Sequence, residues 1–193
     1  MSLQAIKYSP HGLSILDQLL LPHQTEYVEI RNTTSAFKAI RGMVVRGAPA
    51  IAIVAVLSLA VELRSLPPAA TTDVVGFICE KLDYLVQARP TAVNLSDAAR
   101  KLKAVVRGVG GDSPEEVIDR YVAAAEKMLT DDVEDNKNIG KFGAEWVLQN
   151  SETTSDDGKV AVLTHCNTGF ATATRPQTPV FSSLFSFLFF LPC

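Results

Sequence analysis

The sequence predicts an α/β protein, with a mainly helical N-terminal domain that carries a small β portion (residues 1–150) and the first strand of a parallel α/β domain after it. Apolar residues recur at helical spacing through most of residues 33–149. Short alternating runs separated by turn residues occupy residues 1–30. A β-branched run at residues 159–164 follows a polar, turn-rich linker at residues 151–158.

Composition narrows the classes of function. The chain has 193 residues and a net charge of −3, and its basic residues never stand more than two in a row. This argues against nucleic acid and anionic membranes as partners. The N-terminus lacks the pattern of a secretory signal. Cys79, Cys166 and Cys193 are widely spaced and odd in number, so we expect reduced thiols in the cytoplasm and no zinc site.

The first 30 residues predict three short strands. LQAIKY at 3–8 and LSILDQ at 13–18 alternate in part, and Ser9–Gly12 forms a turn between them. YVEI at 27–30 fits a third strand. Thr33, Thr34 and Ser35 then offer N-caps for a helix that carries Phe37, Ile40 and Met43.

The segment Arg46–Ile51 opens the most apolar helix, which runs to about Arg64. Pro49 suits the first helical turn, and Gly47 permits a backbone angle that other residues resist. The free N–H groups of that turn, with Arg46 beside them, would suit a phosphate. Taken alone, an ordinary core helix with a solvated arginine is the commoner arrangement.

Two further helices follow. The first starts after Thr72, a cap, with Asp73 in its first turn, and ends at Ala88–Pro90. Its apolar face is Val74, Phe77, Ile78, Leu82 and Leu85. The second opens at Thr91–Asn94 and ends at 108–111. Its apolar face is Leu95, Ala98, Ala99, Leu102 and Val106.

Arg89 stands at the junction between these helices, as Arg46 stands before its own. Two arginines at two such junctions could clamp one anion. The alternative, which the residues alone favour, is that both are solvated.

Ser113–Glu116 is a strong helix start, and the helical pattern continues to about Gln149. Its apolar stripe is Ile118, Val122, Ala125, Leu129, Ile139, Gly143 and Val147. The stripe also passes through Asp132 and Asn136. Either the helix breaks near Asp131, or these polar groups support a polar cavity. The break is the simpler interpretation, because this stretch is poor in helix formers.

After the linker, Lys159–Thr164 predicts a buried parallel strand that leads into His165–Gly169. Ligands bind at such strand ends in doubly wound folds. Cys166 lies there, near the start of an expected helix, which favours a reactive thiolate. Cys79, on a helix face, is expected to be a small core residue.

The last residues, 174–193, do not fit this pattern. Arg175–Pro179 cannot form the expected helix, and Val180–Leu191 is rich in phenylalanine but too short for a comfortable membrane span. We expect an aggregation-prone tail, with a re-entrant anchor as the less favoured alternative.

Four motifs resemble those of the methylthioribose-1-phosphate isomerase family. This family belongs to one superfamily with the regulatory subunits of translation initiation factor 2B. The motifs are Val45–Ile51, Ala88–Asn94, Asp135–Gly140 and Leu163–Gly169. The likeness runs from residue 1 to about residue 173, and the opening segments LQAIKY and LDQLLLP agree with it.

The resemblance implies a helical domain followed by a Rossmann-like α/β domain, of which residues 159–173 are only the start. It implies that Arg46, Gly47, Ala48 and Arg89 bind a phosphorylated sugar and that Cys166 is the active-site cysteine. It also implies a cofactor-free enzyme without a metal, homodimeric at full length, in the cytoplasm and also the nucleus.

The implied reaction interconverts 5-methylthioribose 1-phosphate and 5-methylthioribulose 1-phosphate in methionine salvage. Cys166 would act as a base in an enediol route or stabilise a polarised oxygen in a hydride shift, and the sequence leaves both open. The family's proton-donating aspartate lies beyond the point of divergence near Thr174. We therefore expect this 193-residue form to be truncated and inactive, with residues 1 to about 149 folded.

Two alternatives remain at this stage. One is a related sugar-phosphate isomerase acting on ribose 1,5-bisphosphate. The other is a non-catalytic regulatory subunit related to translation initiation factor 2B, against which the cysteine-containing loop at His165–Gly169 argues.

Overall fold

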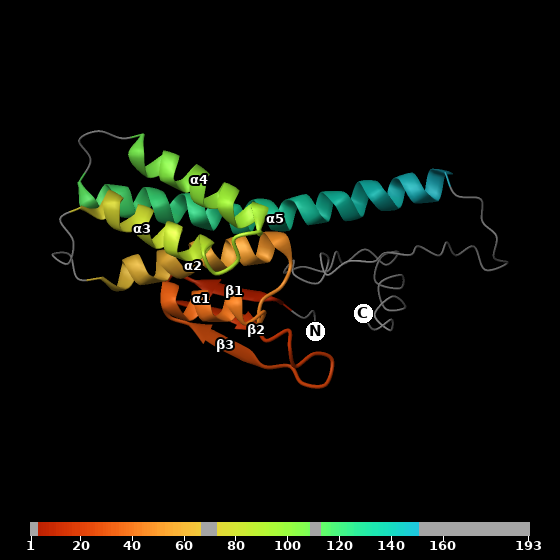
Figure 1. The fold of residues 1–193 in the computed structure, drawn as a ribbon. Coiled ribbons are helices and arrows are strands. Elements are labelled where there is room, and N and C mark those ends of the chain that lie inside the picture. Colours follow the sequence, from red (N-terminus) through yellow and green to blue (C-terminus); the bar gives the residue numbers. More distant parts are fainter. Residues whose placement is uncertain (1–3, 67–72, 109–112, 151–193) are drawn as a thin grey trace.

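A computed structural model describes residues 4–66, 73–108 and 113–150. The described part is mostly helical, with a small three-stranded sheet (Figure 1). The strands are β1 (Ile6–Ser9), β2 (Gly12–Leu16) and β3 (Tyr27–Ile30). The helices are α1 (Thr33–Arg41), α2 (Ala48–Ser65), α3 (Val74–Val86), α4 (Val93–Arg107) and α5 (Pro114–Asn150). The predicted linker, strand and tail at 151–193 lie outside the described residues.

The sheet confirms the three predicted strands. Its order is β1-β2-β3, and both pairs are antiparallel, with Ile6 opposite Ile15 and Leu13 opposite Ile30. These four side chains are buried, so one face of the sheet packs inward. In Figure 1 the sheet and α1 lie on one side of α2, and α3, α4 and α5 lie on the other.

The most apolar helix, α2, is the centre of the core. Thirteen of its eighteen residues are buried, on every side of the helix. Its length and composition would also suit a membrane span, but most of it is enclosed by the other elements. Burial of each large aliphatic side chain contributes about 1.5–3 kcal/mol. Tyr121 of α5 is fully buried against this helix, and its hydroxyl donates to the Val56 carbonyl at 3.0 Å.

The predicted faces of α3 and α4 are confirmed in the core, but the predicted cap of α3 is wrong. Ile78, Leu82 and Leu85 of α3 are buried, as are all five residues predicted for α4. The cap of α3 is Asp73, whose carboxylate accepts from the Gly76 N–H at 2.8 Å. The predicted cap, Thr72, lies outside the described residues. Cys79 is a buried core residue, as expected.

Helix α1 is capped by Asn32 and not by the three residues that follow it. The Asn32 side chain accepts from the Ser35 N–H, and the Ser35 hydroxyl accepts from the Asn32 N–H, which completes a capping box. Aspartate, asparagine, serine and threonine are all good N-cap residues, and four consecutive residues of these types occupy Asn32–Ser35. Met43 lies beyond the end of α1, so it is not a helical residue.

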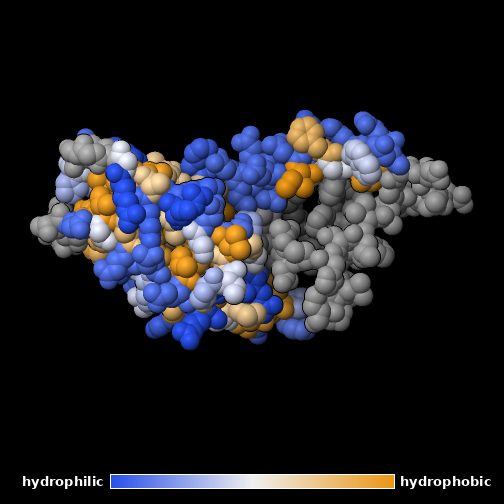
Figure 2. All heavy atoms as spheres, turned by 45° about the horizontal axis from the view of Figure 1, so that its top comes forward, coloured by the Kyte–Doolittle hydropathy of each residue, from blue (hydrophilic) through white to orange (hydrophobic). Residues whose placement is uncertain are grey.

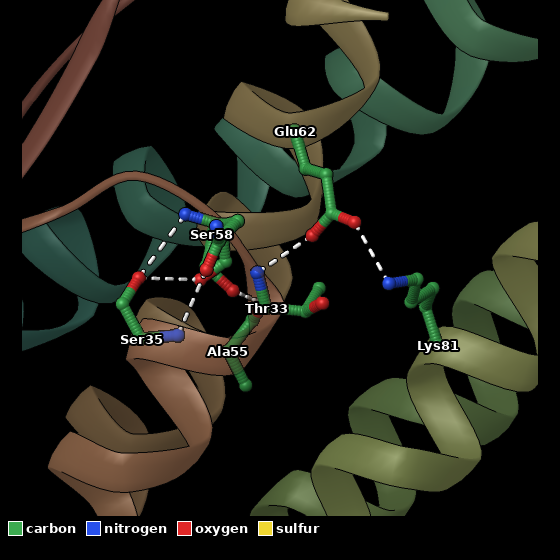
Figure 3. Close-up of polar contacts among 7 residues, drawn as sticks. Thr33, Ser35, Ala55, Ser58, Glu62 and Lys81 are labelled. Atoms are coloured by element: carbon green, nitrogen blue, oxygen red, sulfur yellow. Dashed lines mark hydrogen bonds and ion pairs between the residues drawn. The ribbon is translucent and has the colours of Figure 1, made fainter. Parts of the chain in front are cut away.

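The start of α1 is also held by a carboxylate from α2 (Figure 3). Glu62 accepts from the Thr33 N–H at 2.6 Å and pairs with Lys81 of α3 at 2.8 Å. Burial alone would raise the pKa of the Glu62 carboxyl, but the hydrogen bonds from Lys81 and Thr33 outweigh it and leave that pKa below its ordinary value. One side chain thus joins three helices.

Helix α5 is continuous for 37 residues, so the predicted break near Asp131 is wrong. Lys127 pairs with Asp131 one turn later at 2.6 Å, and the Asn136 side chain donates to the Asp132 carbonyl at 2.7 Å. Such i,i+4 contacts support helix where intrinsic propensity is low. Half-burial, with the nearby Asp135, raises the pKa of the Asp132 carboxyl.

Only the first half of α5 is in the core. Val117, Tyr121, Val122 and Ala125 are buried there. The second half projects beyond the other helices (Figure 1). On it Ile139, Phe142 and Trp146 are 70%, 59% and 65% exposed. Figure 2 shows orange apolar side chains among hydrophilic ones on this projecting part. The predicted stripe is therefore a core stripe only in its first part.

Candidate functional site

The predicted anion-binding segment, Arg46–Ile51, spans the end of the connection between α1 and α2 and the first turn of α2. Two residues of this connection have positive φ, Met43 at 61° and Gly47 at 97°. Between them, Val45 is buried and Arg46 is partly exposed. The φ of Gly47 confirms that a glycine is required before Ala48, because a side chain is strained at that angle.

The first turn of α2 offers unused donors. Gly47 is its N-cap and gives no side-chain hydrogen bond, and Pro49 lacks an N–H. Within the described part of the chain, the N–H groups of Gly47, Ala48 and Ala50 have no hydrogen-bond partner. A helix N-terminus with free N–H groups attracts anions. Arg46 directly precedes Gly47 in the chain, and its Nε donates to the Met43 carbonyl at 3.3 Å.

Arg89 lies in the connection between α3 and α4. Backbone hydrogen bonds hold this connection on both sides, from the Ala88 N–H to Leu85 and from the Ala92 N–H to the Arg89 carbonyl. Ala88 is buried, which anchors the backbone beside Arg89. The Arg89 guanidinium is partly exposed and makes no ion pair or hydrogen bond with any other described residue. It is therefore available for a ligand.

The topology brings the two arginines to one end of the helical layer. Helix α3 runs antiparallel to α2, so the α3–α4 connection and the start of α2 lie at the same end (Figure 1). At that end α5 passes beyond the other helices and carries the segment Asp135–Gly140. Three of the four motifs found in the sequence therefore lie toward the same end of the described part of the molecule (Figure 1).

Cys166, the predicted catalytic residue, lies outside the described residues. Gln18 was not singled out from the sequence, yet its side-chain amide donates to the Arg46 carbonyl at 3.4 Å. It belongs to the segment LDQLLLP, whose agreement with the isomerase motifs was the one signal that pointed to it.

Relatives with curated names match most of this chain. It is 56% identical over 176 residues to the methylthioribose-1-phosphate isomerase of Pyrenophora tritici-repentis, which covers 88% of this chain and 44% of that protein. It is 53% identical over 175 residues to the protein of the same name from Yarrowia lipolytica, covering 88% and 47%. The chain thus spans about half the length of these relatives.

Solved structures agree on the fold. The 5-methylthioribose 1-phosphate isomerase of Pyrococcus horikoshii OT3 superposes with a TM-score of 0.68 at 32% identity, covering 74% of this chain and 40% of that one. The translation initiation factor eIF-2B subunit delta of A. fulgidus superposes with a TM-score of 0.64 at 33% identity, covering 75% and 42%. The sequence profile of the Initiation factor 2 subunit family matches residues 44–179, and the chain belongs to that family.

Proposed function

We propose that this chain is the N-terminal half of an aldose–ketose isomerase that interconverts 5-methylthioribose 1-phosphate and 5-methylthioribulose 1-phosphate. The observation that carries the proposal is the set of unused donors at the start of α2, with Arg46 beside them and the unpaired Arg89 at the same end. The names of the relatives at 50–56% identity support this substrate.

In this proposal the described residues hold the phosphate and do not perform the hydrogen transfer. The N–H groups of Gly47 and Ala48 and the two guanidinium groups provide charge and donors for a dianion on the anomeric oxygen. Holding the phosphate fixes C1 and C2 of the sugar while the ring opens, which lowers the entropic cost of reaction. Cys166 would lie near C1 and C2, as base or as a donor to the polarised oxygen.

A chimera tests the proposal directly. Residues 1–173 of this chain, followed by the rest of the Yarrowia lipolytica isomerase, are expected to convert 5-methylthioribose 1-phosphate. The variant Cys166→Ala is expected to abolish turnover and leave substrate binding intact. The variants Arg46→Ala and Arg89→Ala are each expected to raise KM at least tenfold, the loss of one charged hydrogen bond. An inactive but folded chimera contradicts the proposal.

The 193-residue chain itself is expected to show no isomerase activity. The matched region makes up 44–47% of these relatives, and the resemblance assigns the proton donor to sequence beyond the motifs found in this chain. We also propose that the full-length protein is a homodimer in the cytoplasm and the nucleus. Gel filtration with light scattering of the chimera measures its mass, and fractionation of cells with an antibody to residues 1–150 measures its location.

A second candidate is a non-catalytic subunit of a translation factor complex. The TM-score of 0.64 to the eIF-2B subunit delta favours it, since the described fold is similar to structures from both groups of proteins. Copurification of the full-length protein with a translation initiation factor, together with a catalytically inactive chimera, would support this candidate over the isomerase. The other alternative, an isomerase that acts on ribose 1,5-bisphosphate, is tested by adding this sugar as a competing substrate in the chimera assay.

A further inference from the structure

We infer that Gln18 is a positioning residue of the proposed phosphate site, and that it fixes the peptide between Arg46 and Gly47. The inference rests on the proposed function, because it concerns how that site is built. Gln18 follows β2 and is 28 residues away from Arg46 in the chain. It touches the α1–α2 connection through both its main chain and its side chain.

The main chain of Gln18 contacts the α1–α2 connection independently of its side chain. The Gln18 N–H donates to the Val44 carbonyl at 3.0 Å, which fastens the middle of the connection to the end of β2. The Val44 N–H donates to the Ala39 carbonyl at 2.9 Å, which fastens the same residue to α1. These two bonds do not depend on the side chain at position 18. A substitution of Gln18 therefore leaves the course of the connection in place.

The side-chain contact acts on a different peptide. The Gln18 amide donates to the Arg46 carbonyl at 3.4 Å, directly before Gly47. In a trans peptide the carbonyl of one residue and the N–H of the next point in opposite directions. Holding the Arg46 carbonyl toward Gln18 therefore holds the Gly47 N–H away from Gln18.

The peptide between Arg46 and Gly47 can change its orientation easily unless a hydrogen bond restrains it. Gly47 has φ of 97° and no side chain, so alternative orientations of its peptide cost less than they would at any other residue. Its N–H has no partner within the described part of the chain, so that end of the peptide is free. The carbonyl end is held by Gln18 alone among the described side chains. Without the amide, the Gly47 donor would be distributed over several directions before phosphate binds.

The consequence is a loss of affinity and not of catalytic power. Phosphate is held in the substrate and in the transition state alike, so weaker holding raises KM and leaves kcat unchanged. The expected size is about tenfold in KM, which corresponds to one hydrogen bond to a charged group.

The test compares Gln18→Met with Gln24→Met in the chimera. Methionine keeps the length and flexibility of glutamine and removes the donor. Gln24 is exposed and makes no side-chain hydrogen bond among the described residues, so it controls for the change of residue type. Gln18→Met is expected to raise KM about tenfold with kcat and Tm unchanged, and Gln24→Met to change none of the three. Gln18→Glu removes the amide donor and also places a negative charge beside the proposed phosphate site, so it is expected to raise KM by more than Gln18→Met does.

A second readout does not depend on activity. Inorganic phosphate is titrated into the 193-residue chain, and the amide resonances of Gly47 and Ala48 are followed by NMR. We expect both to shift in the wild type and in Gln24→Met, and the Gly47 shift to be lost in Gln18→Met. Equal Gly47 shifts in both variants would overturn the inference.

The outcomes separate the inference from the proposed function. If Arg46→Ala raises KM in the chimera while Gln18→Met and Gln18→Glu do not, the phosphate site stands and the role of Gln18 is wrong. If Arg46→Ala also leaves KM unchanged, the phosphate site itself is wrong, and the role of Gln18 with it.

Discussion

The carboxylate of Glu62, a partly buried residue of α2, accepts the first backbone N–H of α1, that of Thr33, at 2.6 Å (Figure 3). The two residues are 29 positions apart in the chain. Because Glu62 also pairs with Lys81, one acidic group fixes α1, α2 and α3 against each other. The α1–α2 connection, with Arg46, begins where α1 ends, so its placement depends on this contact.

Glu62→Gln is expected to lower the free energy of unfolding by about 1–2 kcal/mol at pH 7, because it removes the charge from a partly buried, hydrogen-bonded pair. The folded pKa of Glu62 is lowered below 4.5. Its contribution is therefore complete above that pH and is lost as the pH falls through the folded value. Urea unfolding of both proteins from pH 7 to pH 3 measures this, and the two curves should converge in acid. Glu29→Gln, which breaks only an exposed pair with Arg31, should leave the unfolding midpoint unchanged.

Gly47→Ala is expected to destabilise the protein by about 1–2 kcal/mol, because alanine is strained at φ of 97°. Gly143→Ala is the matched control, since a Cβ there meets no atom within 4 Å inside a regular helix. That change should stabilise by about 0.5–1 kcal/mol. Thermal unfolding of the two variants should therefore move in opposite directions. A shift of the same sign in both would show that the backbone at Gly47 is not as described.

Asp132→Asn is expected to stabilise the protein at neutral pH. The folded pKa of Asp132 is raised by half-burial and by the nearby Asp135, so the ionised form is disfavoured in the folded state. Its unfavourable effect is present at neutral pH and disappears as the pH falls and the group is protonated. The gain is about 0.3 kcal/mol, as for other like-charge pairs on a helix. A Tm that fails to rise at pH 7, or a gain that persists at pH 3, would contradict this account.

Phe142→Glu is expected to change the free energy of unfolding by less than about 0.5 kcal/mol, because the side chain is mostly exposed on the projecting part of α5. Ala125→Glu, in the buried half of the same helix, should cost several kcal/mol or prevent folding. Trp146 is the one tryptophan of the chain, so fluorescence reports on it alone. In a fragment of residues 1–150 we expect the emission of a solvated indole, readily quenched by acrylamide. Blue-shifted, protected emission would show that the projecting half is covered.

The sequence predicted most of the fold, because apolar spacing decides which faces are buried. All five residues predicted for the inner face of α4 are buried, and the Ser113–Glu116 capping box is present as predicted. Caps were predicted less well, because several suitable residues stand together at Asn32–Ser35 and only tertiary position selects one. The break at Asp131 was wrong because residue propensities ignore the i,i+4 contacts that bridge the weak stretch.

The site was predicted only in part. Arg46, Gly47 and Arg89 are marked by their places at helix junctions, and the structure brings those junctions to one end. Gln18 could not be recognised from local pattern, because its contact with Arg46 depends on how the sheet meets the α1–α2 connection. Long-range hydrogen bonds of this kind have no signature in residue spacing.

Because α5 is continuous, a small tilt of the helix in the core produces a larger displacement at its far end. Its 37 residues correspond to a rod about 55 Å long, and the 18 residues after Asp132 account for about 27 Å of it. A tilt of about 5° where the helix leaves the core therefore displaces its far end by about 2 Å. Catalytic groups lose much of their effect when they are misplaced by about 1 Å. Packing around Tyr121 and Ala125 in the core thus decides, on this scale, where the end of α5 at Asn150 lies.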